Sequence, residues 1–265
     1  MRFTAKLLLV GLVVPLLLLG FISASIKFQL LNAKFWLATF ERHNVYTTGA
    51  EALKNYAEGQ IVKEGGRKSD AKVITDLITP ENLKDITEKN ITNFLSYANG
   101  RKPELMVYLP VKKIPKGLLP KNYANIPEEI EISSLLDKYG IKVISRTQIQ
   151  QFSLMGRAAT YFMVLDLSLC ALFIFLLFLL TESGSRFVFP GATFIITGLL
   201  AIMFFRGGVQ PQMGTEATLA EKSLPAQVVF LNILPPLIQE ISKGWIVAGI
   251  ALVGLGVVLL VLRKK

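Results

Sequence analysis

The sequence predicts a mainly α-helical membrane protein with four transmembrane helices and a mostly helical extracytoplasmic domain, with minor β structure, between the first and second helices. Two observations lead to this fold class. Of the 265 residues, 52% are hydrophobic and only 18% are charged, which is too apolar for an ordinary soluble domain. The apolar residues also gather in runs near the roughly 20 residues that a helix needs to cross a hydrocarbon core. These runs lie at 7–26, 160–181, 187–205 and 244–262.

The cations that flank the runs predict the topology. Arg2 and Lys6 precede the first run, Arg186 lies in the turn between the second and third, and residues 263–265 are all basic. Because such cations mark the cytoplasmic side, we expect a multi-pass protein of the cell membrane with both termini in the cytoplasm. The predicted segments are a transmembrane helix at 1–26, an extracytoplasmic domain at 27–159, transmembrane helices at 160–181 and 187–205, a second extracytoplasmic loop with an interfacial helix at 206–243, and a transmembrane helix at 244–262.

The first run has two interpretations. Its basic start, its leucine-rich centre and Ser23-Ala24-Ser25 are also typical of a secretory signal peptide that is cleaved after Ser25. A retained anchor is favoured, because apolar residues continue at roughly helical spacing from Ile26 to Leu37. We expect this helix to continue to about Glu58 and to stop at Gly59, unless Gly49 breaks it earlier.

The clearest element of the predicted domain is a helix over 79–99. Thr79 is a favourable N-cap, Pro80 suits the first helical position, and Asn99-Gly100 is a helix-stop signal. Apolar residues lie on one side of this helix and charged residues on the other, so one face should pack against a core.

The rest of the domain carries weaker signals. Residues 59–70 predict a polar loop, and residues 104–109 predict a short strand that pairs with 142–144. Five prolines between 103 and 127 favour an extended stretch over a helix. A last helix is expected to begin at Ser145 and to run without a break into the second span.

A resemblance to a protein family follows from three short motifs. Ile78-Thr79-Pro80-Glu81 leads through the amphipathic helix to Tyr97-Ala98-Asn99-Gly100 and then to Leu105-Met106-Val107-Tyr108-Leu109. In this order the motifs resemble the outer domain of an uncharacterised family of bacterial integral membrane proteins. The resemblance implies an N-terminal anchor, an extracytoplasmic domain and C-terminal transmembrane helices. It implies no activity, so no functional residue is transferred.

Asp166 interrupts the second apolar run. An ionisable group near the centre of a membrane helix costs about 2.5–3.5 kcal/mol and usually faces a partner or water. Asp166 with Arg206 is therefore the candidate intramembrane polar site, as an ion or proton site. The alternatives are a structural pair with Arg206 or Lys243, or a protonated acid bonded to a neighbouring helix. A structural role is favoured, because the four runs hold no second carboxylate, histidine or lysine that could continue a relay.

The fourth run predicts a helix-packing face. Gly244, Ala248 and Ala251 share one stripe, and small residues let another membrane helix approach closely. Packing within the bundle is favoured over an oligomer contact. Before this run, the apolar segment 224–236 is expected to form an interfacial helix that Pro235-Pro236 ends, with a re-entrant segment as the sharper alternative.

No catalytic, cofactor or metal site is predicted. The chain has a single histidine, His43, and a single cysteine, Cys170, and it carries no glycine-rich phosphate loop. The predicted outer domain holds 20 Lys and Arg against 14 Asp and Glu between residues 27 and 157. We expect partners that suit this charge, namely membrane lipid, an acidic envelope polymer or another envelope protein, with oligomers possible and without nucleic acid or cofactors.

Three functions fit these features. The favoured one is a non-enzymatic integral membrane protein of the cell envelope, in which a four-helix bundle anchors an extracytoplasmic binding or assembly domain. The alternative is a component of a transporter or channel that uses Asp166. The second alternative is an enzyme that acts on lipid or cell-wall precursors at the outer face. The predicted cytoplasmic segments are too short for a nucleotide-binding or signalling domain.

Overall fold

The computed structural model of the protein describes residues 2–103, 105–110, 129–131, 146–182, 186–207 and 233–262. These residues are mainly helical, as the sequence predicts. The chain divides into two compact units. We call Met1–Gln29, Ala158–Gln212 and Ile238–Lys265 the apolar unit, and Leu30–Arg157 with Met213–Leu237 the polar unit.

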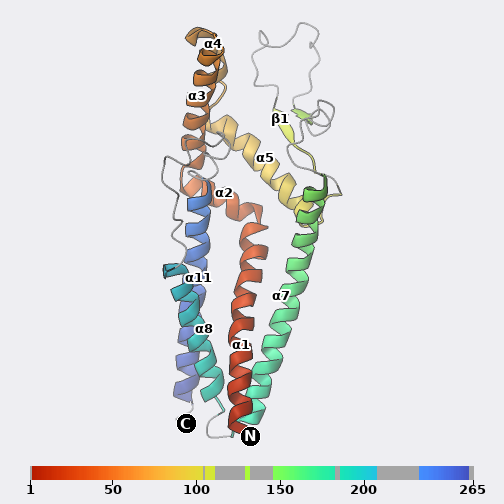
Figure 1. Ribbon diagram of the computed structural model, residues 1–265, viewed down its shortest axis with the longest axis vertical. Helices are drawn as coiled ribbons and strands as arrows, with labels where there is room; N and C mark the ends of the chain where they lie inside the picture. The colour runs from red at the N-terminus through yellow and green to blue at the C-terminus, as the bar shows by residue number, and fades with distance from the viewer. Residues whose placement is uncertain are drawn as a thin grey trace. The chain divides into compact units, whose positions relative to one another are not determined.

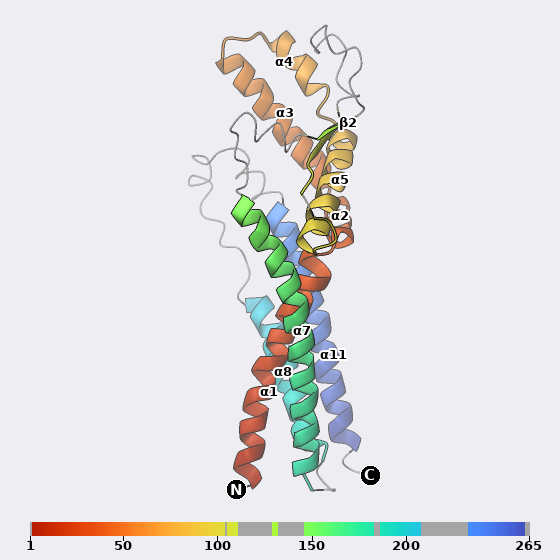
Figure 2. The ribbon, with the colours of Figure 1, turned by 90° about the vertical axis from the view of Figure 1, so that its right-hand side faces the viewer.

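Long helices lie side by side in the apolar unit (Figures 1 and 2). They are α1 (Arg2–Ser25), most of α7 (Arg146–Leu180), α8 (Val188–Gly207) and most of α11 (Leu234–Leu262). Three helical stretches, Phe3–Leu30, Gly156–Leu180 and Leu234–Leu262, are long and apolar enough to cross a membrane. The described apolar stretch of α8, Val188–Phe204, is shorter, so a fourth span stays a prediction.

The start of α11 differs from the sequence prediction. The helix begins at Leu234, so Pro235 and Pro236 lie in its first turn and do not end a preceding helix. Proline is favourable there, because the first amide groups of a helix have no acceptor inside the helix. Residues 234–243, which the sequence analysis assigned to a loop, are helical for the same reason. Residues 208–232, which hold most of that predicted loop, lie outside the described residues.

The expected single helix to Glu58 is wrong, because the helix is interrupted at two asparagines, Asn32 and Asn44. A π-helical turn, η1 (Ile26–Leu30), follows α1, and Asn32 then caps α2 (Ala33–Arg42) by accepting a bond from the Lys34 amide at 3.1 Å. Asn44 has a φ of 53° and precedes α3 (Val45–Lys63). Asparagine tolerates this left-handed conformation better than most residues. The expected breaks at Gly49 and Gly59 do not occur, since both glycines lie inside α3.

The described part of the polar unit contains four helices that lie wholly within it. They are α2, α3, α4 (Lys68–Thr75) and α5 (Pro80–Ala98). The helices α3 and α4 form a hairpin through a turn at 64–67, so the predicted polar loop is shorter than 59–70 (Figure 2). The core cluster of the polar unit joins residues of α2, α3 and the start of α11, and partly buried side chains surround it. The buried members are Phe40, Val45, Tyr46 and Leu237, and the surrounding ones are Phe35, Trp36, Leu83, Ile91 and Ile233.

The caps of α5 confirm the sequence prediction. The Thr79 hydroxyl accepts a hydrogen bond from the Asn82 amide at 3.1 Å, and Pro80 begins the helix. Asn99 is the C-cap, and Gly100 follows with a φ of 70°. The Asn99 side chain also donates to the carbonyl of Leu31 at 2.8 Å, so the end of α5 is bonded to the residue that follows η1.

The predicted strand is present but has another partner. The strand β1 (Tyr108–Pro110) pairs antiparallel with β2 (Glu129–Glu131), with Tyr108 opposite Glu131. The proposed partner segment 142–144 lies outside the described residues. The side chain of Asn90 donates to the Tyr108 carbonyl at 2.9 Å and accepts from the Tyr108 amide at 2.8 Å. The Lys89 ammonium lies 4.2 Å from the centre of the Tyr108 ring, so two residues of α5 hold this strand.

The helix α7 begins close to its predicted start and continues to Leu180 without a break. Within the polar unit, Gly156 of α7 approaches the end of α5. A Cβ atom at Gly156 would lie 2.1 Å from the Ala98 carbonyl oxygen, so only glycine fits at this contact.

Candidate functional site

Asp166 is a buried carboxylic acid in the apolar unit. Its side chain is only 8% exposed, and its Oδ2 atom has no hydrogen-bond partner among the described residues. This oxygen lies against α1 at Gly20, where an added Cβ would be 2.7 Å away. The absence of a side chain at Gly20 therefore provides the space that the carboxyl group occupies.

Neither of the two cations considered as a partner of Asp166, Lys243 and Arg206, is seen to bind it in the described part of the chain. The Lys243 ammonium donates to Glu240 Oε1 at 2.7 Å, so the structure does not support a pair of Lys243 with Asp166, which was one of the alternatives. Arg206 lies in the last turn of α8, and its side chain is outside the described part of the chain. The pair of Asp166 with Arg206 stays a prediction.

Glu240 is a second buried carboxylate that the sequence analysis missed. Its side chain is 8% exposed and lies in α11, inside the candidate span Leu234–Leu262. The missed signal is Pro235-Pro236, which starts this helix and so places Glu240 in its second turn. A second carboxylate therefore lies within a candidate span, contrary to the sequence prediction, and its bond to Lys243 compensates its charge.

Polar contacts join α11 to α1 and η1 near Glu240. The Trp245 indole donates to the Ser25 hydroxyl at 2.7 Å. Four residues after Glu240 on the same face, Gly244 lies against the Gln29 side chain, whose Nε2 atom would be 2.6 Å from a Cβ at Gly244. Gln29 Oε1 is buried and has no hydrogen-bond partner among the described residues. This region therefore combines an unsatisfied amide oxygen, a π-helical turn and a buried carboxylate.

A close helix contact in the described part of the apolar unit joins glycines of α8 and α11. A Cβ at Gly198 would lie 2.5 Å from the Gly249 carbonyl oxygen, and one at Gly256 would lie 2.6 Å from the Gly191 carbonyl oxygen. Both helices repeat glycine after seven residues, so the two pairs lie two turns apart. Of the predicted packing face, Gly244 contacts Gln29, Ala248 is partly buried and Ala251 is exposed. A packing role for Ala248 and Ala251 stays a prediction.

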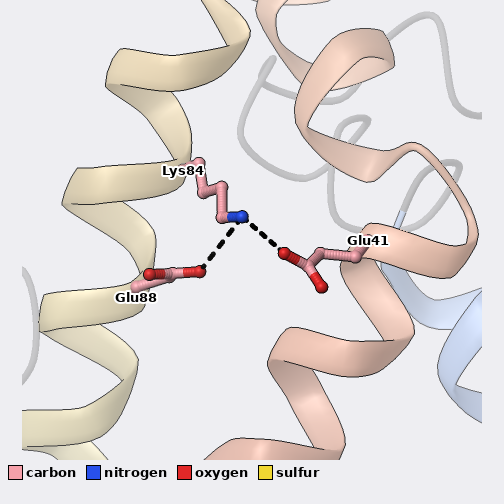
Figure 3. A network of polar contacts seen from close by, with 3 residues as sticks. All are labelled: Glu41, Lys84 and Glu88. Atoms are coloured by element: carbon pink, nitrogen blue, oxygen red, sulfur yellow. Dashed lines mark hydrogen bonds and ion pairs between the residues drawn. The ribbon is translucent and has the colours of Figure 1, made fainter.

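The polar unit contains one charged cluster with defined geometry (Figure 3). The Lys84 ammonium lies between Glu41, to which it donates a short hydrogen bond, and Glu88, at 3.7 Å. The bond to Glu41 raises the pKa of Lys84. All three side chains are substantially exposed, so this network supplies little stability.

Tyr46 lies in the core near this cluster. Burial, together with the negative charges of Glu88 and Glu41, raises the pKa of its hydroxyl group to about 12. The hydroxyl group is buried without a hydrogen-bond partner in the described part of the chain. Tyr46 is therefore held neutral, and its role in this geometry is packing of the core.

The arrangement defines a mainly α-helical protein with three helices suited to a membrane and buried carboxylates inside two of them. Within the described residues, no group of three or more His, Cys, Asp and Glu side chains could hold a metal ion. Comparison with known proteins found no matching family model, no matching curated protein and no matching solved structure. The resemblance of residues 78–109 to a bacterial membrane family therefore stays a prediction.

Proposed function

We propose that the chain is a multi-pass protein of the cell envelope whose polar unit binds or assembles with a partner outside the cytoplasm, while the apolar unit anchors it. One observation carries this proposal: the polar unit has a buried core of its own, formed by Phe40, Val45, Tyr46 and Leu237. A segment with such a core is a folded domain and not a linker between spans.

The net charge of residues 27–157, which hold 20 Lys and Arg against 14 Asp and Glu, favours a partner with negative charge. Several cationic side chains of the polar unit are exposed, and they come from different elements. The exposed cations include Lys34, Arg42, Lys63, Arg67, Lys72 and Arg101. Anionic lipid headgroups, an acidic envelope polymer or an acidic face of another membrane protein would each suit such a surface.

Purification of the full chain in mild detergent, after cross-linking in the native membrane, tests the proposal. We expect a defined partner to copurify and its cross-links to lie in the polar unit, at the exposed lysines Lys34, Lys63 and Lys72. Replacement of these lysines by glutamate should release the partner, whereas replacement by arginine should retain it. Cross-links confined to the apolar unit, or a partner that the glutamate variant retains, would contradict the proposal.

A second candidate function is ion movement through the apolar unit. The observation that favours it is the presence of two buried carboxylates, Asp166 and Glu240, on two different candidate spans. The test is ion flux into vesicles that contain the purified chain, with Asp166→Asn and Glu240→Gln as matched neutral variants. Flux that both variants abolish would support a transporter component, and flux equal to that of empty vesicles would exclude it.

A further inference from the structure

The contact between Asp166 and Gly20 joins α7 to α1, and the Asp166 Oδ2 atom in it has no hydrogen-bond partner among the described residues. The carboxyl group is nine-tenths buried, and its Oδ2 atom faces the Cα of Gly20. An ionised carboxylate in such a place keeps neither its water nor a compensating donor, which is strongly unfavourable. A protonated carboxyl group carries no net charge and fits the same space.

The charged groups around this contact do not offer an alternative partner. Cys170 lies one turn along α7 on the same face and is also buried. The helix α1 has no ionisable residue between Lys6 and Lys27, and α8 has none from Val188 to Phe204. In α11, Glu240 and Lys243 bind each other. Lys27 in η1 and Arg206 in the last turn of α8 are the other cations of the unit near this end of the helices.

We propose that Asp166 is a proton-binding site and that α1 stays closed against α7 at Gly20 only while the carboxyl group holds its proton. Loss of the proton to water leaves a carboxylate that must be hydrated, and water can reach it only if α1 moves away from α7. The closed contact is therefore present at low pH and is lost as the pH rises. This inference goes beyond the proposed function, because it requires neither a partner nor ion transport.

The single cysteine of the chain reports on this contact without any added label site. Cys170 is 3% exposed and lies on the Asp166 face of α7, so opening of the contact should expose its thiol. The experiment measures the alkylation rate of Cys170 by an uncharged maleimide against pH, for the full chain in lipid vesicles. Asp166→Asn is the matched variant, because it has the same size and does not ionise in this range.

We expect the ratio of the wild-type rate to the Asp166→Asn rate to rise several-fold with pH. The comparison is made at pH values well below the titration of the thiol, where the ratio cancels the ordinary ionisation of the thiol and a negative charge at position 166 would lower the ratio by slowing thiolate formation. Gly20→Ala should speed alkylation of the wild-type background at low pH, where the contact is closed, because its methyl group collides with Oδ2, whereas Gly11→Ala has open space and should have no effect. A ratio that stays constant or falls with pH would overturn the proposal.

Infrared spectroscopy keeps the proposal testable if Asp166→Asn does not fold. Wild-type chain with ¹³C-labelled aspartate should show, at neutral pH, the C=O stretching band of one protonated carboxyl group. This band should disappear over the pH range in which Cys170 becomes reactive. Spectra that contain only aspartate carboxylate bands at neutral pH would overturn the proposal.

Discussion

At the scale of single residues, Tyr46 shows how one side chain serves packing at the expense of its polar group. Its ring packs edge-on against Phe40, with 5.9 Å between the ring centres. Its hydroxyl group is buried without a partner in the described part of the chain. The core therefore favours the neutral phenol, and its pKa rises from 10.0 to about 12.

This shift predicts a stability change at alkaline pH. Because the folded pKa lies above the unfolded value of 10.0, the stabilisation is complete below pH 10 and is lost as the pH rises through about 12. The wild-type chain should lose about 2 kcal/mol relative to Tyr46→Phe over this window. Denaturant unfolding of both proteins as a function of pH measures the difference, in which the other titrating groups cancel. Parallel curves for the two proteins would show that Tyr46 titrates normally.

At the scale of elements, the sequence predicted α5 well because its signals are local. Thr79, Pro80 and Asn99 act through bonds within a few residues of themselves. The breaks at Asn32 and Asn44 are harder to predict, because asparagine is compatible with both helix and turn. Gly49 is a helix breaker by propensity, yet it lies inside α3, where a Cβ would be 3.2 Å from Leu83 of α5. Tertiary packing against α5 therefore outweighs the low helix propensity of Gly49.

The candidate site shows the same division between local and distant causes. Asp166 was identified from the sequence because a single charge stands out in an apolar run. Glu240 escapes such prediction, because two prolines are compatible with either end of a helix and only the start of α11 at Leu234 decides between them. The contact of Asp166 with Gly20 joins residues far apart in the chain, and no local pattern encodes it.

The glycine contact between α8 and α11 predicts a position-specific loss of stability. Gly198→Ala would bring a methyl group within 2.5 Å of the Gly249 carbonyl oxygen, so the helices must separate. We expect a cost of about 1–3 kcal/mol, seen as a lower midpoint of thermal unfolding in detergent. Gly254→Ala is the control, because nothing lies within 4 Å of its added Cβ. Equal midpoints for the two variants would exclude close packing at Gly198.

The contact of α7 with the end of α5 predicts a similar loss in the polar unit. Gly156→Ala places a Cβ 2.1 Å from the Ala98 carbonyl oxygen, and a backbone atom cannot move aside as a flexible side chain can. This variant should be destabilised by about 1–3 kcal/mol or more. Gly59→Ala, also inside a helix but with open space around it, should be neutral or stabilised by about 0.5–1 kcal/mol. Denaturant unfolding of the two variants measures this contrast.

At the scale of the whole molecule, the proposed topology predicts which residues reagents reach from outside the cell. In a background in which Cys170 is replaced by serine, Glu64→Cys should react with a membrane-impermeant maleimide in intact cells. Glu64 lies in the exposed turn between α3 and α4. Lys265→Cys, at the predicted cytoplasmic end, should react only after the membrane is opened. The opposite pattern would reverse the topology. Reaction of both residues in intact cells would place the carboxyl end outside the cell and would contradict the three spans predicted between Glu64 and Lys265.

The two hydrogen bonds of the Asn90 side chain to the Tyr108 backbone have a consequence for aggregation. A strand with unpaired backbone groups along one edge can form hydrogen bonds with the same strand of a second molecule, and this pairing leads to aggregation. Asn90 occupies both the amide and the carbonyl of Tyr108, as a neighbouring strand would. It therefore blocks pairing with another strand at this position of the sheet edge. A variant without the Asn90 side chain should have a lower solubility at high protein concentration.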